Sequence, residues 1–166
     1  MTRTKTITTY SYKELEGKAK ERAMQWLIEG SYYTGYCEHA NEDAKSIGLK
    51  ITSSDVDRNR HAKGEFIGTA LETAEAILKE HGKVCETYKT AERYLPSLSV
   101  PCPADEDSYD QWETNKADAE HEFLHDLLED YSVMIQYEYE YSHSEEYASD
   151  VAAANDYQFD EDGKIT

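Results

Sequence analysis

Apolar residues recur at helical spacing in several stretches of this chain, most regularly in its last third. From about residue 105 the pattern predicts a long helix with two different faces. On a wheel of 100° per residue, one arc of this helix is apolar and the opposite arc is acidic. The apolar arc contains Phe123, Leu124, Leu127, Leu128, Tyr131, Met134 and Ile135. The acidic arc contains Asp118, Glu122, Asp126, Glu129 and Asp130.

The first fifty residues predict one strand and two helices. Residues 4–9 are rich in Thr and include Ile7, which favours a strand. Ser11 and Glu14 have the spacing of a capping box, so a helix is expected from there to about Glu29. Its apolar stripe would be Leu15, Ala19, Ala23, Trp26 and Leu27. A second helix is expected over residues 36–47, ended by Gly48.

The middle of the chain predicts a β-hairpin followed by two helices. Residues 49–57 and 63–67 have strand character and are separated by a polar turn. Thr69 and Glu72 form a second capping box, which predicts a helix over 70–81. Another helix is expected over 85–95, closed by Pro96, with an extended linker over 97–103.

After the long helix, Tyr137, Tyr139 and Tyr141 alternate with Glu residues. This alternation suits a helix end or a strand, and the period alone does not decide. Ser144 begins a short helix to about residue 155, and residues 157–159 form a final strand. Together the elements predict a single α+β domain over residues 1–166. A small antiparallel sheet, made of the N-terminal strand, the central hairpin and the C-terminal strand, would pack against several helices.

Charge divides the chain into two parts. Residues 104–166 contain twenty of the 35 acidic residues and two of the 17 Lys and Arg, so this part has the full net charge of −18. Residues 1–103 are neutral overall. Nucleic acid and anionic membranes would repel such a surface, whereas a basic protein would be attracted to it. A solvated acidic surface without a partner is the alternative interpretation.

The remaining composition favours a reducing cytoplasm. Three widely spaced cysteines, Cys37, Cys85 and Cys102, do not form the framework of a secreted disulfide protein. No apolar run follows the N-terminus, so neither a signal peptide nor a membrane span is expected. A homo-oligomer is compatible with the sequence.

Ten segments of the chain carry a resemblance when taken together. They are residues 12–15, 18–23, 42–49, 63–66, 77–82, 85–91, 122–124, 126–131, 154–157 and 162–164. As a set they resemble a family of small acidic phage and prophage proteins, which is loosely described as the antitoxin of a toxin–antitoxin stability system. The resemblance implies a phage origin and an accessory role in the cytoplasm of a bacterial host, and it implies no catalytic residues.

The density of negative charge on the long helix suggests a way of acting. Residues 105–130 contain eleven acids and one base. At about 1.5 Å per residue these 26 residues span roughly 39 Å, which gives one net charge per about 3.9 Å. A DNA strand has one charge per about 3.4 Å. The sequence therefore suggests an anti-defence protein, either anti-restriction or anti-CRISPR, that mimics nucleic acid and inhibits a basic host protein.

The residues expected to contact that partner are acids and the aromatic residues between them. An antitoxin that neutralises a basic toxin would use the same electrostatics and is the alternative. The candidate binding residues are Asp110, Trp112, Glu113, Asp118, Glu122, Asp126, Glu129, Asp130, Tyr137, Tyr139 and Tyr141.

Two patterns resemble metal sites. His121, Glu122 and His125 form an H-E-x-x-H pattern on the predicted helix, in which two imidazoles could share a zinc ion, with Glu145 or Glu146 as a third ligand. Two histidines on the surface of an acidic helix are the simpler interpretation, so neither catalysis nor a cofactor is expected. A second set, Cys37, His39, His81 and Cys85, could form a structural zinc site, although the first pair lacks the usual spacing.

Overall fold

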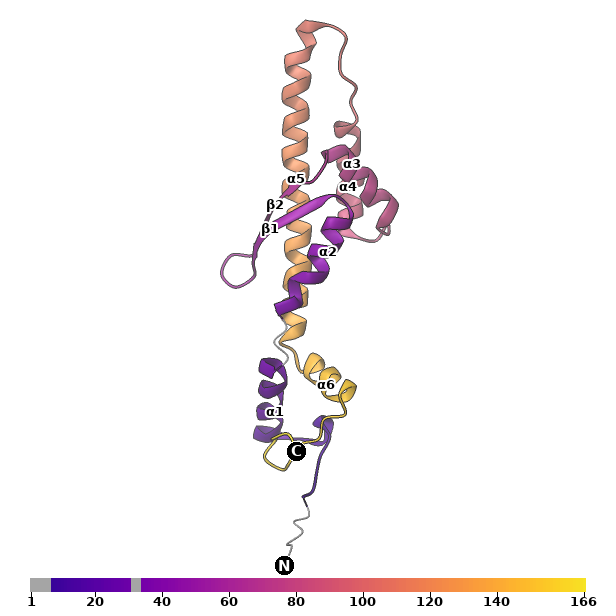
Figure 1. Ribbon diagram of the computed structural model, residues 1–166. Helices are drawn as coiled ribbons and strands as arrows, with labels where there is room; N and C mark the ends of the chain where they lie inside the picture. Colours follow the sequence, from indigo (N-terminus) through magenta and orange to yellow (C-terminus); the bar gives the residue numbers. More distant parts are fainter. Residues whose placement is uncertain (1–6, 31–33) are drawn as a thin grey trace, which may run out of the picture. The chain divides into compact units, whose positions relative to one another are not determined.

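The computed structural model describes residues 7–30 and 34–166, and over these residues the fold is α+β (Figure 1). Contacts divide the chain into two compact units, Cys37–Tyr137 and Met1–Tyr36 with Glu138–Thr166. The first is called the larger unit here and the second the smaller unit. Among the described residues, no helix combines the length and the apolar composition that crossing a membrane requires.

The larger unit is built on a β-hairpin. Strands β1 (Leu49–Asp55) and β2 (His61–Phe66) pair antiparallel, and Thr52 is an extra residue that makes a bulge in β1. Gly64 of β2 lies where a Cβ atom would overlap the carbonyl oxygen of Lys50 and would lie 3.0 Å from Cδ2 of Leu128. The absence of a side chain at Gly64 therefore allows the hairpin to pack closely against the long helix.

Three helices of the larger unit precede the long one. They are α2 (Glu38–Ser46), α3 (Ala70–Glu80) and α4 (Glu86–Leu98). The capping box of Thr69 and Glu72 is confirmed, since the Glu72 N–H donates to Thr69 Oγ1 and Glu72 accepts from the Thr69 N–H. The prediction that Pro96 ends α4 is wrong. Pro96 lies in the last turn, and Ser99 satisfies the Leu95 carbonyl from beyond the end of the helix.

The long helix, α5 (Glu106–Ser142), packs on the sheet and supplies much of the larger unit's core. Phe123 stacks on Phe66 with ring centroids 5.7 Å apart and also contacts Tyr94. The predicted apolar arc is confirmed, because five members are buried and Leu124 and Met134 are partly buried. The helix continues through Tyr137, Tyr139 and Tyr141, which decides between helix and strand for that stretch.

The smaller unit contains a 3-10 turn (Tyr12–Glu14), a further 3-10 turn (Thr34–Cys37, shared with the larger unit), α1 (Gly17–Gly30) and α6 (Glu145–Ala154). The capping box of Ser11 and Glu14 is confirmed, but it opens only the first 3-10 turn, so the prediction of a continuous helix from Ser11 is wrong. Leu15 is extended and buried, and Gly17 has φ of +53°, so the chain turns before α1 begins. The buried core of this unit consists of Tyr12, Leu15, Ala23, Leu27, Ala148, Ala152 and Phe159.

The N-terminal and C-terminal strands predicted from the sequence are not present as strands in the described residues. Residues 4–6 lie outside the described ranges, and residues 7–9 are not in a strand. Tyr10 instead makes a single bridge with Phe159, through two backbone hydrogen bonds of 2.8 and 2.9 Å. Phe159 makes a second bridge with Ile165. The Thr-rich segment lacks the alternating apolar residues that would hold a longer strand against a core.

Candidate partner-binding surface on helix α5

The first half of α5 has an unusual environment. Residues 106–122, called the acidic segment below, contain no buried residue, and the first buried residue of the helix is Phe123. At about 1.5 Å per residue the acidic segment is roughly 25 Å long. It contains seven carboxylates and one base, Lys116. Its helical start is supported by Asp105, whose carboxylate accepts a 2.9 Å hydrogen bond from the Ser108 N–H.

The seven carboxylates form two rows along the acidic segment. At 100° per residue, four fall within an arc of roughly 80° and three within an arc of roughly 60° beside it. The first row is Glu106, Asp110, Glu113 and Glu120. The second row is Asp107, Asp118 and Glu122.

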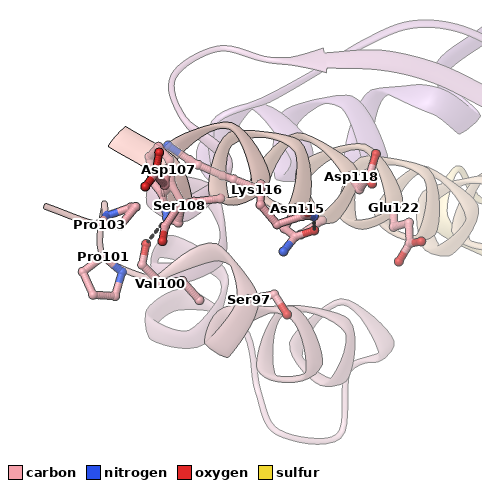
Figure 2. Close-up of a pocket in the computed structure, with 13 residues that line it drawn as sticks. Ser97, Val100, Pro101, Pro103, Asp107, Ser108, Asn115, Lys116, Asp118 and Glu122 are labelled. Carbon is pink, nitrogen blue, oxygen red and sulfur yellow. Dashed lines mark hydrogen bonds between the residues drawn. The ribbon is translucent and has the colours of Figure 1, made fainter. Parts of the chain in front are cut away.

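The second row lies along a groove of about 770 Å³ between α5 and the end of α4 with the linker after it (Figure 2). Val100, Pro101 and Pro103 form the linker side of this groove. Nε1 of Trp112 donates a 3.1 Å hydrogen bond to the Val100 carbonyl, which fixes the linker against the helix. Apolar walls beside carboxylates are suited to a ligand that has both apolar and cationic parts.

One cation already lies in this groove. Nζ of Lys116 is 5.2 Å from the centroid of the Trp112 ring and 3.8 Å from Oε1 of Glu120. A separation below about 6 Å is within the range of a cation–π contact. The Trp112 ring also packs against Tyr109, with ring centroids 5.7 Å apart.

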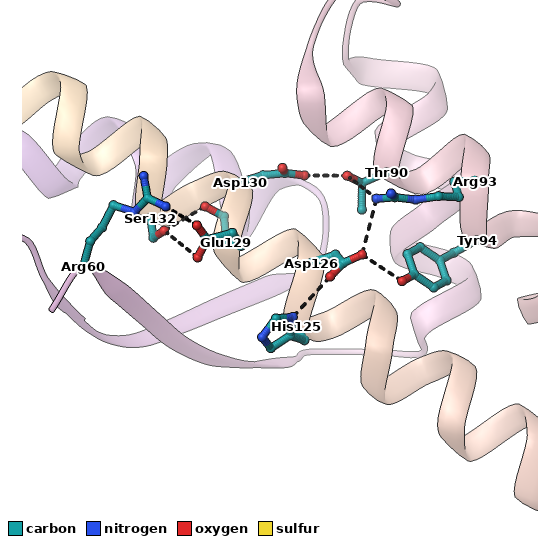
Figure 3. A network of polar contacts seen from close by, with 9 residues as sticks. All are labelled: Arg60, Thr90, Arg93, Tyr94, His125, Asp126, Glu129, Asp130 and Ser132. Carbon is teal, nitrogen blue, oxygen red and sulfur yellow. Dashed lines mark hydrogen bonds and ion pairs between the residues drawn. The ribbon is translucent and has the colours of Figure 1, made fainter.

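Asp126, Glu129 and Asp130, which follow Phe123, have a different role, because they bond to neighbouring elements (Figure 3). Asp126 accepts a 2.8 Å hydrogen bond from the Tyr94 hydroxyl and a 3.3 Å one from Arg93, and His125 lies 3.1 Å away. Partial burial alone would raise the pKa of Asp126, but the hydrogen bonds from Tyr94 and His125 and the charge of Arg93 outweigh it. The pKa of Asp126 therefore lies below its usual value.

Asp130 shows the opposite shift one turn further along. It accepts a 2.7 Å hydrogen bond from Thr90 Oγ1 and is partly buried. Burial raises its pKa, and the negative charges of Glu86 and Asp126 add to that effect, against the hydrogen bond from Thr90. Glu129, on the hairpin side, forms an ion pair with Arg60.

The structure thus divides the predicted binding residues. Those that lie in the acidic segment are Asp110, Trp112, Glu113, Asp118 and Glu122. Asp126, Glu129 and Asp130 do not form the free acidic face that the helical wheel suggested, because they bond to α4 and to the hairpin turn.

The three predicted binding tyrosines of α5 belong to two different units. Tyr137 belongs to the larger unit and is 69% exposed. Tyr139 and Tyr141 belong to the smaller unit, where Tyr139 packs on Tyr36 and the Tyr141 hydroxyl donates a 2.8 Å hydrogen bond to Asp150. These two side chains have structural contacts within their own unit.

The sequence pattern does not indicate the linker side of the groove. It predicts Val100, Pro101 and Pro103 only as part of an extended linker, and Lys116 only as a single positive charge. The available signal was an apolar, Pro-rich stretch directly before a helix that contains Trp112. Prolines fix an extended backbone, so such a stretch can lie along a helix as one wall.

The candidate zinc residues lie in ordinary environments. His121 and His125 are exposed on α5, and His125 is engaged with Asp126. In the second set, His81 bonds to Thr87 Oγ1 at 2.7 Å and lies 3.4 Å from Asp43, while Cys37 contacts Ser54. Over residues 7–30 and 34–166, no group of three or more His, Cys, Asp and Glu side chains is arranged to bind a metal ion.

Comparison of the chain with models of protein families, with curated protein sequences and with solved structures gives no match. The resemblance to small acidic phage proteins stays a prediction. What the geometry defines is an α+β protein with an exposed, strongly acidic helical segment.

Proposed function

We propose that this protein binds a basic partner protein through the acidic segment of α5 and has no catalytic activity of its own. The supporting observation is that residues 106–122 contain seven carboxylates but no buried residue. The core of the larger unit thus has no need of this stretch for packing. Seventeen ordered residues beyond the core favour a binding role over a purely stabilising one.

The spacing of the carboxylates supports mimicry of a nucleic acid strand. Seven carboxylates and Lys116 over roughly 25 Å give one net charge per about 4.2 Å, comparable to the 3.4 Å per phosphate along one DNA strand. Their division into two rows presents charge over a broad arc of the helix. The partner is then a host protein whose basic groove normally binds nucleic acid, and a defence nuclease fits the phage origin that the resemblance implies.

The rest of α5 gives the acidic segment a fixed position in the larger unit. Phe123 packs between aromatic rings, and Asp126 and Asp130 bond to α4 one and two turns beyond the segment. Charges held on a rigid helix lose little conformational entropy when a partner binds. The acids after Phe123 therefore contribute indirectly, by positioning those before it.

Affinity capture with a DNA competitor tests the proposal. The immobilised protein is incubated with bacterial lysate, and bound proteins are eluted with increasing salt or with duplex DNA. Basic nucleic-acid-binding proteins should elute in both cases, because DNA competes for the same groove and salt screens the charges. Direct displacement of labelled DNA from a purified captured protein then confirms the competition.

A pair of charge-matched variants makes the test specific. Glu106→Lys with Glu113→Lys should abolish capture. Glu75→Lys with Glu92→Lys changes the net charge equally, at exposed positions on α3 and α4, and should retain it. Equal loss with both variants, or capture that resists high salt and DNA, would contradict the proposal.

A further inference from the structure

We infer that the groove beside the acidic segment binds an extended segment of the partner that contains arginine, with one guanidinium against the Trp112 ring. This inference depends on the proposed function in one respect, namely that the partner is basic. The groove lies between α5 and residues 97–103 (Figure 2).

The shape of the groove favours a peptide segment. Its volume of about 770 Å³ lies within the range of sites that accept small ligands, and it is open to solvent along the helix. Val100 is 51% exposed and lies beside Pro101, so part of the linker wall is apolar surface without cover from the described residues. The aliphatic part of an arginine side chain would cover such a wall while its charged end remains hydrated.

The charges of the groove select a cation. Asp107, Asp118 and Glu122 line it, against one base, Lys116. An anionic ligand such as a nucleotide would meet three carboxylates. A guanidinium instead can form paired hydrogen bonds with a carboxylate.

The position of Lys116 shows where the partner's cation would lie. Its ammonium is 5.2 Å from the centroid of the Trp112 ring, so the protein itself places a cation on that ring. Glu120, 3.8 Å from Lys116, offers the ammonium a second partner when it leaves the ring. A planar guanidinium stacks on an indole better than an ammonium does, which favours the exchange.

Tryptophan fluorescence provides the test. The chain has two tryptophans, so Trp26→Phe leaves Trp112 as the sole reporter in an otherwise complete protein. The probe is a capped hexa-arginine peptide, with hexalysine and hexaglutamate as comparisons. We expect a saturable change in Trp112 emission with hexa-arginine, weaker binding of hexalysine, and no change with hexaglutamate.

Two double variants with the same net charge separate the groove from general attraction. Both pairs are made in the Trp26→Phe background. Asp118→Asn with Glu122→Gln should weaken hexa-arginine binding about tenfold more than Glu106→Gln with Glu113→Gln, because only the first pair removes carboxylates of the groove. A tenfold change corresponds to about 1.4 kcal/mol. All four positions are exposed, and unchanged circular dichroism and melting temperature confirm that the variants fold. Equal weakening by the two pairs would overturn the groove assignment.

A third variant tests the role of Trp112. Lys116→Gln removes the resident cation and should increase the affinity for hexa-arginine. Unchanged or reduced affinity would overturn the placement of the peptide's guanidinium on the Trp112 ring. Absence of any hexa-arginine binding would also overturn the inference. A peptide-sensitive dimer in light scattering would show that a second copy occupies the groove, which contradicts it as well.

The two proposals fail in different ways. If lysate proteins are captured in a DNA-competed manner but the groove variants behave like their controls, only the groove assignment is wrong. If the groove variants act as expected but no basic protein is captured, the proposed function is wrong while the peptide site stands.

Discussion

The hydroxyl of Tyr131 donates a 2.7 Å hydrogen bond to Oδ2 of Asp43, which joins α5 to α2 inside the larger unit. Tyr131 is fully buried, whereas Asp43 is partly exposed. The same carboxylate also lies 3.4 Å from His81, at the end of α3. Asp43 therefore links three helices, and Tyr131 is its contact on the long one.

We expect Tyr131→Phe to lower the free energy of unfolding by about 1.5 to 3 kcal/mol, the usual range for a hydrogen bond to a charged group. Urea unfolding followed by circular dichroism measures the change. Tyr137→Phe makes the same chemical change on the same helix at a side chain that is 69% exposed, and it should alter stability by less than about 0.5 kcal/mol. Equal effects of the two substitutions would show that the hydrogen bond to Asp43 contributes nothing.

The Tyr131 hydroxyl should also affect stability at high pH. Burial, together with the hydrogen bond and charge of Asp43, raises the pKa of Tyr131 well above its usual value. The unfolded chain loses this proton near pH 10, whereas the native state retains it. The contribution of the Tyr131 hydroxyl to the free energy of unfolding is therefore complete below about pH 10 and is lost as the pH rises further. Between pH 9 and 11 the free energy of unfolding, measured by urea unfolding, should fall more steeply with pH for the wild type than for Tyr131→Phe.

Asp126 and Asp130 should respond to pH in opposite ways. The folded pKa of Asp126 is lowered, so its contribution to stability is present above the unfolded value of about 3.9 and is lost as the pH falls through the folded value. Asp126→Asn should therefore lower stability at pH 7, by about 1 to 2 kcal/mol for its hydrogen bonds, and by less at pH 2. Urea unfolding across this range measures both effects.

For Asp130 the folded pKa is raised, so the wild type gains stability as the pH falls through that value towards 3.9. Asp130→Asn lacks this gain. At pH 7 it should equal or exceed the wild type in stability, because an amide oxygen can still accept the hydrogen bond from Thr90. At pH 3 it should be the less stable of the two. The same sign of pH dependence for both substitutions would contradict the assigned environments.

Gly163 provides a prediction for the smaller unit. Its φ is +77°, and a Cβ atom there would overlap the carbonyl oxygen of Ala19 on α1. Gly163→Ala should therefore destabilise this unit by about 2 to 4 kcal/mol. Trp26 packs on Tyr157 and Phe159 of the smaller unit, so its fluorescence in a Trp112→Phe background follows the unfolding of this unit.

Gly30→Ala is the matched control for Gly163→Ala, because Gly30 belongs to the same unit and a Cβ atom there meets nothing within 4 Å. Its effect on the smaller unit should be negligible. A melting temperature for Gly163→Ala equal to that of the control would show that the turn adapts without cost.

Zinc should neither stabilise the protein nor give it peptidase activity. His121 and His125 are exposed, and two imidazoles without a third ligand bind zinc weakly. We expect equimolar zinc to leave the melting temperature of the wild type unchanged, as it should for the double variant His121→Ala with His125→Ala. A zinc-dependent increase that both substitutions remove, with peptide hydrolysis that Glu122→Gln abolishes, would establish the H-E-x-x-H pattern as a catalytic site.

Local rules predicted most elements of this fold. The capping box at Thr69, the stop after α2 at Gly48 and the cap of α6 at Ser144 all depend on neighbours within four residues, and the structure has them where they were expected. The capping box at Ser11 also forms, but a distant contact intervenes after it. Leu15 is buried in the core with Phe159 and Ala152, and the helix expected there is interrupted.

The candidate site was predicted only in part for the same reason. Charge and helical period identified Asp118 and Glu122 correctly as exposed acids of one helix. They gave the same interpretation to Asp126, whose partners Arg93 and Tyr94 lie more than thirty residues away. A helical wheel shows which residues share a face, but it does not show what that face meets.

The sequence by itself determined the α+β class, the start of the amphipathic helix near residue 105 and the concentration of negative charge on the last third of the chain. These properties follow from composition and from periodicity along a single element. Only the tertiary structure decided which carboxylates are free. Helix α4 and the hairpin turn place Thr90, Arg93, Tyr94 and Arg60 against α5 after Phe123, so the acids there bond within the protein. Before Phe123 the end of α4 and the linker line the groove beside the helix, and most of the carboxylates there face solvent.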